Sequence, residues 1–144
     1  DAVVSHALAL ALGYARAVAL FAVRGTAQGI AAAGEIERHD LRDVLVAPEA
    51  GSLLAAAIER GTPARGAPEP SGIDARLARL LRRVEPAEVA YFPIRIGDRV
   101  VNLLYADNGS EPLLETSCTA LAALCQRVAQ SYERIIREKK RQLC

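Results

Sequence analysis

Residues 89–107 read VAYFPIRIGDRVVNLLYAD, which is two runs of alternating residues joined at Gly97-Asp98. A Gly-containing pair between two such runs is typical of a β-hairpin with a two-residue turn. Because a two-residue loop sets the register, the predicted pairs are Ile96 with Arg99, Ile94 with Val101, Phe92 with Leu103 and Ala90 with Tyr105. The other elements of the fold are placed around this hairpin.

This register divides the hairpin into two faces. The face with Phe92, Ile94 and Leu103 is almost wholly apolar and is expected to meet the core. The opposite face is mixed and carries Val89, Tyr91, Pro93, Arg95, Val100, Asn102, Leu104 and Ala106. A mixed face suits a sheet surface that loops and small helices half cover. We therefore expect any ligand pocket on this side.

The remaining sequence predicts further strands and helices from apolar spacing and from Gly and Pro. Helices are predicted over 2–12, 49–60 and 73–84, strands over 16–24, 27–36 and 44–46, and a Gly- and Pro-rich loop over 61–72. Gly13 and Gly61 act as C-terminal stops, and Ser52 is a candidate N-cap. The first helix is apolar on nearly every face, so we expect the sheet to cover one side of it and another helix, or a partner subunit, to cover the other.

The last helix is predicted to begin near Ser110, a candidate cap, with Pro112 in its first turn and Glu111 and Glu115 at its positive end. Its apolar residues recur every three or four positions and form one stripe: Leu114, Cys118, Leu121, Cys125, Val128, Tyr132 and Ile135. Such a helix is longer than one sheet requires. We therefore predict a homodimer through the first and last helices, at Leu8, Leu12, Leu121, Cys125, Val128, Tyr132 and Ile135.

Composition limits the class of protein. A chain of 144 residues with 51% hydrophobic residues buries one core. A net charge of +1 and 4% aromatic residues disfavour a nucleic-acid partner. Arg16 lies within the apolar run 3–23 and argues against a membrane span. Three cysteines without a CxxC spacing suit reduced thiols, so we expect a cytoplasmic protein with no structural disulfide.

Three stretches carry a family resemblance: Tyr91-Phe92-Pro93-Ile94 leading through Gly97 to Val101 and then Leu104-Tyr105-Ala106-Asp107, the segment Ile58-Glu59-Arg60-Gly61-Thr62-Pro63, and the first hairpin with Phe21. Together with the order of elements, they resemble the GAF domain over almost the whole chain. The resemblance implies an α+β fold, with N- and C-terminal helices on one face of a central antiparallel sheet and short helices and loops on the other. It also implies a sensory or dimerising unit of bacterial signalling proteins.

We expect residues 1–144 to form one GAF-like domain of a longer multidomain chain, because the first residue is Asp1 rather than Met. Neighbouring domains of that chain are then expected partners. The cofactor is unknown. The sequence lacks the NKxDE-like pattern of cyclic-nucleotide binders, a cysteine in the 61–72 loop for a bilin, and a histidine in the later helices for haem. Asn102 replaces a small residue of many GAF domains, which bears on the pocket volume.

Candidate ligand-binding residues are Tyr91, Arg95, Asn102, Leu104 and Arg65, and Arg99 is a further cation near them. Guanidinium groups grip carboxylate or phosphate at two points, so an anionic small molecule is one expected ligand. Their alternative role is that of exposed strand cations, which blunt aggregation at a sheet edge.

Other reactive groups have simpler explanations. His39-Asp40 is a candidate general base or metal half-site, but it lacks further ligands and fits a solvated loop better. Cys118 and Cys125 fit buried apolar positions, and Cys144 and the basic run 134–141 fit a frayed or continuing helix end. We predict no metal site and no catalytic residues.

Three functional hypotheses follow. The leading one is a non-catalytic sensory or regulatory domain that binds a small ligand or relays a signal through helix-mediated dimerisation. The second is a degenerate GAF fold that acts only as a dimerisation or protein-interaction scaffold, because its own side chains fill the pocket. The third, and most remote, is a thiol-dependent reductase. Free methionine sulfoxide reductases resemble this fold but need cysteines clustered at the pocket.

Overall fold

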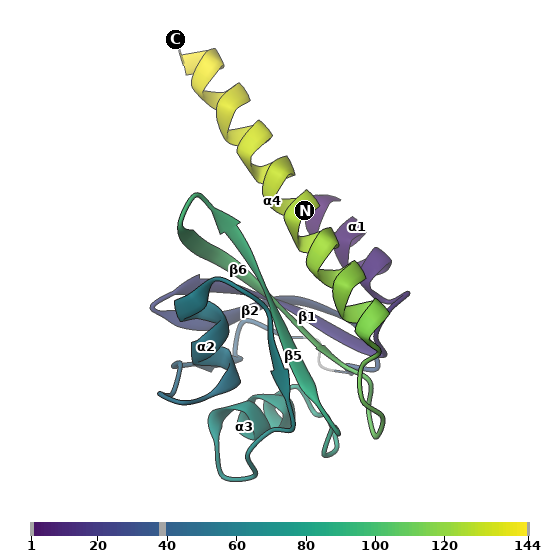
Figure 1. Cartoon of the computed structure of the whole chain (residues 1–144). Coiled ribbons are helices and arrows are strands. Elements are labelled where there is room, and N and C mark those ends of the chain that lie inside the picture. The colour runs from purple at the N-terminus through teal and green to yellow at the C-terminus, as the bar shows by residue number, and fades with distance from the viewer. Residues whose placement is uncertain (1, 38–39, 144) are drawn as a thin grey trace.

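A six-stranded antiparallel sheet, in the order β3-β2-β1-β6-β5-β4, forms the middle layer of the protein (Figure 1). The computed structural model describes residues 2–37 and 40–143. The strands are β1 Ala17–Arg24, β2 Thr26–Gly34, β3 Leu45–Val46, β4 Ala64–Gly66, β5 Val89–Ile96 and β6 Arg99–Asp107. The helices are α1 Ala2–Ala11, α2 Leu53–Arg60, α3 Ile73–Leu80 and α4 Glu115–Leu143. The predicted α+β class is confirmed.

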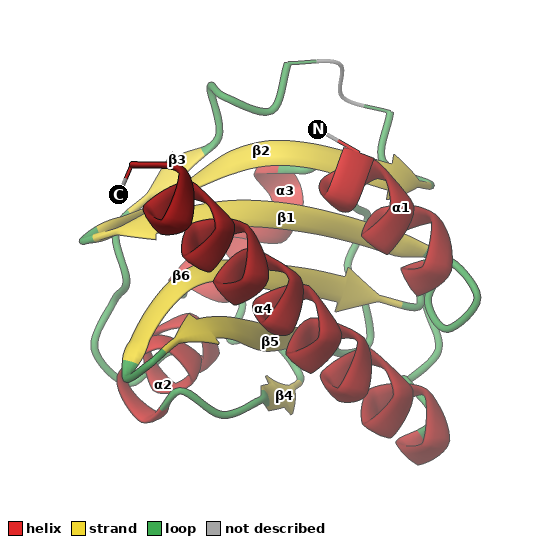
Figure 2. Ribbon diagram, turned by 90° about the horizontal axis from the view of Figure 1, so that it is seen from above, coloured by secondary structure: helices red, strands yellow, loops and turns green. Residues whose placement is uncertain are grey.

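Helices cover both faces of this sheet. The terminal helices α1 and α4 lie on one face, where α4 crosses the strands obliquely (Figure 2). The short helices α2 and α3 lie on the other face (Figure 1). Each face has its own apolar cluster, one centred on Leu20, Leu104 and Leu121 and the other on Phe21, Leu54 and Leu77. This arrangement of layers is the one that the resemblance to GAF domains implied.

The predicted hairpin is present, but its predicted register is wrong beyond the turn. Ile96 pairs with Arg99 as predicted, and Gly97 takes a positive φ in the turn. Val101 is then an extra residue in β6, so Ile94 pairs with Asn102 instead of Val101. Such a β-bulge shifts all later pairs by one residue, which exchanges the two faces of one strand relative to the other.

The consequence is a different set of side chains on each face. Leu104 pairs with Phe92, and both lie in the cluster that faces α1 and α4. Tyr105 pairs with Tyr91, and both lie with Leu103 in the cluster that faces α2 and α3. The predicted mixed face therefore does not exist beyond the bulge, because Val89 and Tyr91 of β5 lie in the α2–α3 cluster whereas Leu104 and Ala106 of β6 lie in the α1–α4 cluster.

Local signals located the short helix α2 accurately. The Ser52 side chain accepts a hydrogen bond from the Ala55 amide at 3.0 Å, as an N-cap does. Gly61 takes a left-handed conformation at the C-terminus, and its amide donates to the Ala57 carbonyl. The predicted loop 61–72 was incomplete, because residues 64–66 within it form β4 at the sheet edge.

The last helix begins later than predicted, at Glu115 rather than near Ser110. The chain before it forms a tight turn in which Asn108 and Glu111 are bridged. The Leu113 amide donates to the Glu88 side chain at 3.0 Å. These contacts hold residues 108–113 in a turn rather than in a helix. Ser110 is therefore not the N-cap of α4.

Close backbone contact at Gly29 positions the loop that follows β2. The Gly29 amide donates to the Val44 carbonyl at 2.9 Å. A Cβ atom at Gly29 would lie 2.3 Å from the Leu41 carbonyl oxygen, which is too close for any side chain. The pairing of β1 with β2 also shifts register next to Gly29, where Ile30 is the extra residue. Gly29 therefore allows the loop to pack directly on the sheet.

We expect Gly29→Ala to lower the free energy of unfolding by about 1–3 kcal/mol, because the new methyl group overpacks this contact. Urea unfolding followed by circular dichroism measures the change. Gly66→Ala in β4 is the matched control, since its Cβ would lie 3.6 Å from the nearest Leu53 atom, an ordinary contact. Equal stability of the two variants would contradict this account of Gly29.

Candidate functional site

The sheet face beneath α2 and α3 is filled by side chains of the protein itself. Tyr91 and Tyr105 are both fully buried, and their rings meet edge to face with centroids 5.9 Å apart. Leu54 from α2 and Leu77 from α3 are likewise inaccessible to solvent. Aromatic rings in this arrangement occupy the space that a small ligand would need on this face.

Asp74 joins the two short helices to the sheet. This buried carboxylate in the first turn of α3 accepts hydrogen bonds from the Leu53 and Leu54 amides at 2.8 and 3.1 Å. It therefore caps the N-terminus of α2 from another helix. The Tyr91 hydroxyl also donates to it at 2.8 Å. Burial, followed by the nearby Asp74 charge, raises the pKa of Tyr91 well above its usual value, so this hydroxyl stays a donor.

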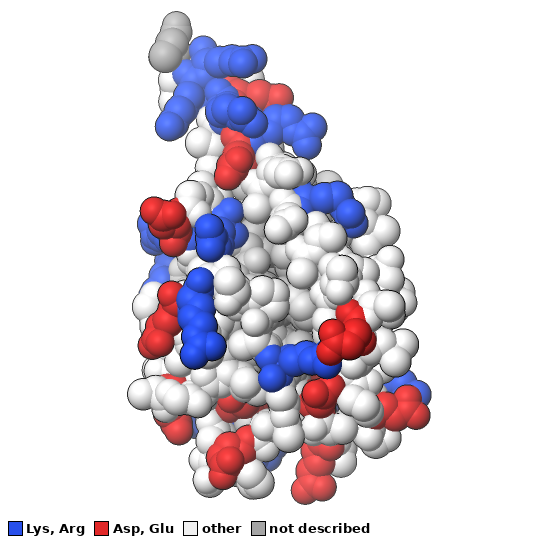
Figure 3. Space-filling view, in the orientation of Figure 1, with Lys and Arg blue, Asp and Glu red and all other residues white. Residues whose placement is uncertain are grey.

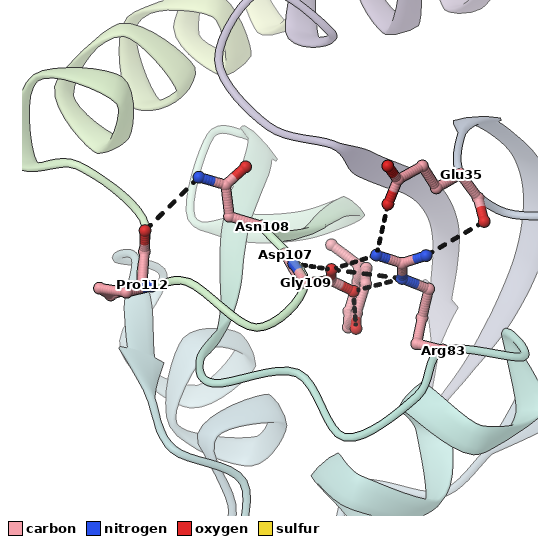
Figure 4. A network of polar contacts seen from close by, with 7 residues as sticks. Glu35, Arg83, Asp107, Asn108, Gly109 and Pro112 are labelled. Atoms are coloured by element: carbon pink, nitrogen blue, oxygen red, sulfur yellow. Dashed lines mark hydrogen bonds and ion pairs between the residues drawn. The ribbon is translucent and has the colours of Figure 1, made fainter.

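Asp107 forms a second buried polar centre at the end of β6 (Figure 4). Arg83 grips the carboxylate through Nε at 2.9 Å and Nη2 at 2.8 Å, and Tyr105 donates to it at 2.7 Å. The Gly109 amide adds a bond at 2.9 Å. The hydrogen bond to Asp107 raises the pKa of Arg83, and burial raises that of Tyr105. This network ties the loop after α3 to the end of the sheet.

Arg83 also reaches the end of β2. Its Nη1 donates to the Glu35 carbonyl at 3.1 Å, and its Nη2 lies 3.3 Å from the Glu35 carboxylate. In Figure 4 the guanidinium lies between Glu35 and Asp107. All three guanidinium nitrogens are thus engaged by the protein, so Arg83 is a structural cation and not a ligand-binding one.

The structure separates the five predicted ligand-binding residues. Tyr91 is buried under α2 and α3, whereas Leu104 lies on the opposite face, under α1 and α4. The Asn102 side-chain amide donates to the Phe21 carbonyl at 3.1 Å and is nearly inaccessible. Arg65 and Arg95 lie near the β4–β5 edge of the sheet. No single pocket of the described residues can use all five, because the bulge divides the hairpin members between two faces.

Two of the predicted residues line grooves beside α4. Arg95 donates to the Gly61 carbonyl at 3.3 Å and borders a groove of about 690 Å³ with Gln126 and Gln130. Arg65 pairs with Glu115 and lies 2.9 Å from the Cys118 sulfur, beside a groove of about 280 Å³. Both guanidinium groups contact protein atoms at the surface, so each helps to attach the sheet edge to its neighbours.

An apolar groove lies between α1 and α4. It has a volume of about 610 Å³ and is lined mainly by small and aliphatic side chains, among them Val3, Ala7, Leu10, Leu124 and Val128. Within one chain, the sheet and α4 cover only part of α1. Val4, Leu8 and Ala11 are buried, but Leu10 is 43% exposed. The uncovered side of α1 and the adjacent strip of α4 form one continuous surface.

The assigned dimer residues fall into two groups. Leu8, Leu121, Cys125 and Val128 are buried within the domain and attach the two helices to the sheet. Leu12 and Ile135 are exposed, at 39% and 40%, and Tyr132 is half-buried. Beyond the sheet, α4 continues away from the domain (Figure 1). Surface for a partner is therefore available at Leu12, Tyr132 and Ile135 but not at the four buried positions.

Cys118 and Cys125, the two cysteines of the described residues, do not form a reactive cluster. Cys125 is buried, and burial raises the pKa of its thiol to about 12, so it is protonated at neutral pH. Cys118 lies two turns away on the same helix. Within 2–37 and 40–143, no group of three or more His, Cys, Asp or Glu residues is arranged to hold a metal ion. His39 and Cys144 lie outside the described residues.

No helix within residues 2–37 and 40–143 has both the length and the apolar character that are needed to cross a membrane.

Comparison with solved structures identifies the fold. The GAF domain of PixJ from Thermosynechococcus elongatus, in its blue-light absorbing form, matches with a TM-score of 0.75 at 15% identity over 99% of this chain and 89% of that one. This chain has the GAF fold. The GAF domain/HD domain protein from Geobacter sulfurreducens gives a TM-score of 0.72 at 15% identity, over 92% and 91% of the two chains. No protein-family model matches the sequence, and no curated protein matches it.

An enzyme shares this GAF fold. The type II free methionine-R-sulfoxide reductase from Thermoplasma acidophilum matches with a TM-score of 0.62 at 12% identity, over 89% of each chain. The fold is therefore found in both the GAF domain of PixJ and a reductase. Only the residues of the site, not the fold, can separate the functions of such proteins.

Sequence reasoning missed the residues that organise the GAF interior. Asp74 and Arg83 lie in helical or loop sequence that looks like ordinary exposed surface. Asp107 was noted only as the acidic residue that closes the strand pair. A weak signal was available, since an acidic residue at the start of a predicted helix suits an N-terminus. Nothing local indicated that Asp74 would cap a different helix.

We expect Arg83→Met to lower the free energy of unfolding by about 3–5 kcal/mol, because it leaves the buried Asp107 carboxylate without its cation. Urea unfolding measures the loss. Arg76→Met, at an exposed position of α3, is the control and is expected to change stability by less than about 0.5 kcal/mol. Adding Asp107→Asn to Arg83→Met should recover part of the loss. A double variant no more stable than Arg83→Met would contradict the pairing.

Proposed function

We propose that this chain is a non-catalytic sensory or regulatory domain that relays a signal through helix-mediated dimerisation. The supporting observation is the apolar groove between α1 and α4, which continues into the exposed stripe of α4. GAF domains usually work as sensory or dimerising units, and the PixJ neighbour is described in a light-absorbing form. A second copy of the chain would cover the groove with the same apolar surface.

The length of α4 supports this proposal. The helix has 29 residues, and its C-terminal part extends past the sheet, where Ile135 and Ile136 are 40% and 38% exposed. Single exposed apolar residues are ordinary, but a stripe that continues from a buried helix face favours helix pairing. Basic side chains gather on the projecting end (Figure 3), at Arg134, Arg137, Lys139, Lys140 and Arg141. That end suits a polar, solvated continuation toward a neighbouring domain.

The filled interior favours relay over ligand capture at the sheet. Tyr91 and Tyr105 occupy the face beneath α2 and α3, and the buried carboxylates Asp74 and Asp107 hold both hydroxyl groups. A ligand there would have to displace two rings and leave two buried carboxylates with fewer donors. This observation also favours the second candidate function, a scaffold that dimerises without sensing a small molecule.

The thiols support a non-catalytic role. A reductase of this fold would need a reactive thiolate at a substrate pocket. Cys125 is a buried neutral thiol, and Cys118 lies two helical turns away at the surface groove beside Arg65. The rise of an α-helix over seven residues is roughly 10 Å, so these two sulfurs cannot bond to each other within one helix.

We expect the protein to sediment as a dimer at micromolar concentration. Leu10→Glu and Ile135→Glu should each shift it toward monomer, because a charge would be buried in the helix interface. Val84→Glu is the matched control: Val84 is 87% exposed and follows α3, which lies on the other face of the sheet from α1 and α4 (Figure 1). A wild-type monomer that persists when flanking sequence is restored would refute the dimer.

Native mass spectrometry of protein purified from its own host separates the sensory domain from the scaffold. A dimer that retains a small molecule at a defined stoichiometry would support sensing. We expect a dimer whose sheet interior holds no ligand. Slower amide hydrogen exchange at Tyr91 or Tyr105 in the presence of the retained molecule would place that molecule in the interior. This result would contradict our expectation.

A further inference from the structure

A separate cavity of about 380 Å³ lies on the outer side of α3. Its walls come from the stretch after β4, from one side of α3 and from the chain that leads into β5. It does not include the α1–α4 groove or the interior beneath α3. Its volume falls within the range of small-molecule sites.

Much of the wall of this cavity is apolar and has few rotatable bonds. Three proline rings contribute to it, those of Pro68, Pro70 and Pro86, and the methyl groups of Ala75 and Ala78 form its α3 side. Proline and alanine have almost no side-chain rotamer freedom to lose when a ligand binds. The shape is therefore preformed for a small apolar group.

The chain at one side of the cavity is held in a strained conformation. Arg82 and Glu85 are non-glycine residues with positive φ, at 60° and 37°. Such residues persist only where their surroundings enforce the conformation. Arg83, between them, supplies that enforcement through its bonds to Asp107 and Glu35 (Figure 4). Strain of this kind is typical of binding sites that are fixed before the ligand arrives.

The charges that line the cavity select the ligand class. Arg79 is exposed, and its guanidinium makes one long hydrogen bond, at 3.5 Å to the Pro70 carbonyl. Its remaining N–H groups suit a bidentate carboxylate. Arg83 also lines the cavity, but Asp107 and Glu35 already occupy its guanidinium. Glu85 adds a negative charge, which disfavours a ligand with a second anionic group.

We propose that this cavity binds a small monocarboxylate with an apolar body, held by Arg79 at its carboxylate and by the proline and alanine walls at its apolar end. The site is independent of the α1–α4 dimer. A monomeric protein that binds such a ligand would refute the proposed dimer relay alone, and a dimer that binds none would refute this site alone.

The test is an NMR titration of the full chain with benzoate, following backbone amide shifts. Saturable shifts are expected at 67–70, 75–79 and 85–87, except at Pro68, Pro70 and Pro86, which have no backbone N–H. Benzamide has the same shape without the charge, and benzene-1,3-dicarboxylate adds a second charge. Both should bind at least tenfold more weakly than benzoate.

Two variants locate the site. Arg79→Gln should weaken benzoate binding at least tenfold, whereas Arg76→Gln, on the exposed side of the same helix, should leave it unchanged. Ala75→Phe fills the cavity and should abolish binding while amide shifts of the sheet stay in place. Absence of saturable binding at millimolar benzoate would overturn the proposal. So would shifts centred on the α1–α4 groove, or equal affinity in Arg79→Gln and Arg76→Gln.

Discussion

Antiparallel pairing of β5 and β6 has to accommodate one extra residue, Val101, and the layers on both sides of the sheet depend on where it is placed. The bulge brings Tyr105 opposite Tyr91 on the face of α2 and α3 and sends Leu104 to the face of α1 and α4. Two tyrosine rings in edge-to-face contact then fill the space under the short helices. The closed interior of this GAF fold thus follows from a single irregular position in one ladder.

Buried carboxylates complete this interior because tyrosine hydroxyls under a helix layer need acceptors. Asp74 serves Tyr91 and also caps α2, so one side chain holds two helices and a strand together. Asp107 serves Tyr105 and anchors Arg83, which in turn holds the strained chain after α3. The same network that closes the interior therefore shapes the cavity on the outer side of α3.

The two faces of the sheet divide the proposed roles. The α2–α3 face is rigid and filled, and the terminal helices on the other face leave an apolar groove between them. A regulatory domain with this architecture changes its output most readily through α4, since that helix alone projects beyond the sheet among the described residues (Figure 1). Movement of α4 against α1 requires no opening of the tyrosine-filled interior.

Local sequence determined the elements whose signals are local: the Gly97 turn, the Ser52 and Gly61 caps, the apolar stripe of α4 and the α+β layers. Tertiary structure decided the rest, because its causes lie far apart in the chain. No local pattern marks Val101 as an extra residue, since the bulge depends on how β1 and β5 pair with β6 on both sides. In the sequence, Asp74 looks like a surface residue. Only the tertiary structure shows that it accepts hydrogen bonds from the first amides of α2. Separation of Tyr91 from Asn102 and Leu104 followed from that one shift in register, which the period-2 pattern alone does not encode. Arg65 lies on a different strand, β4.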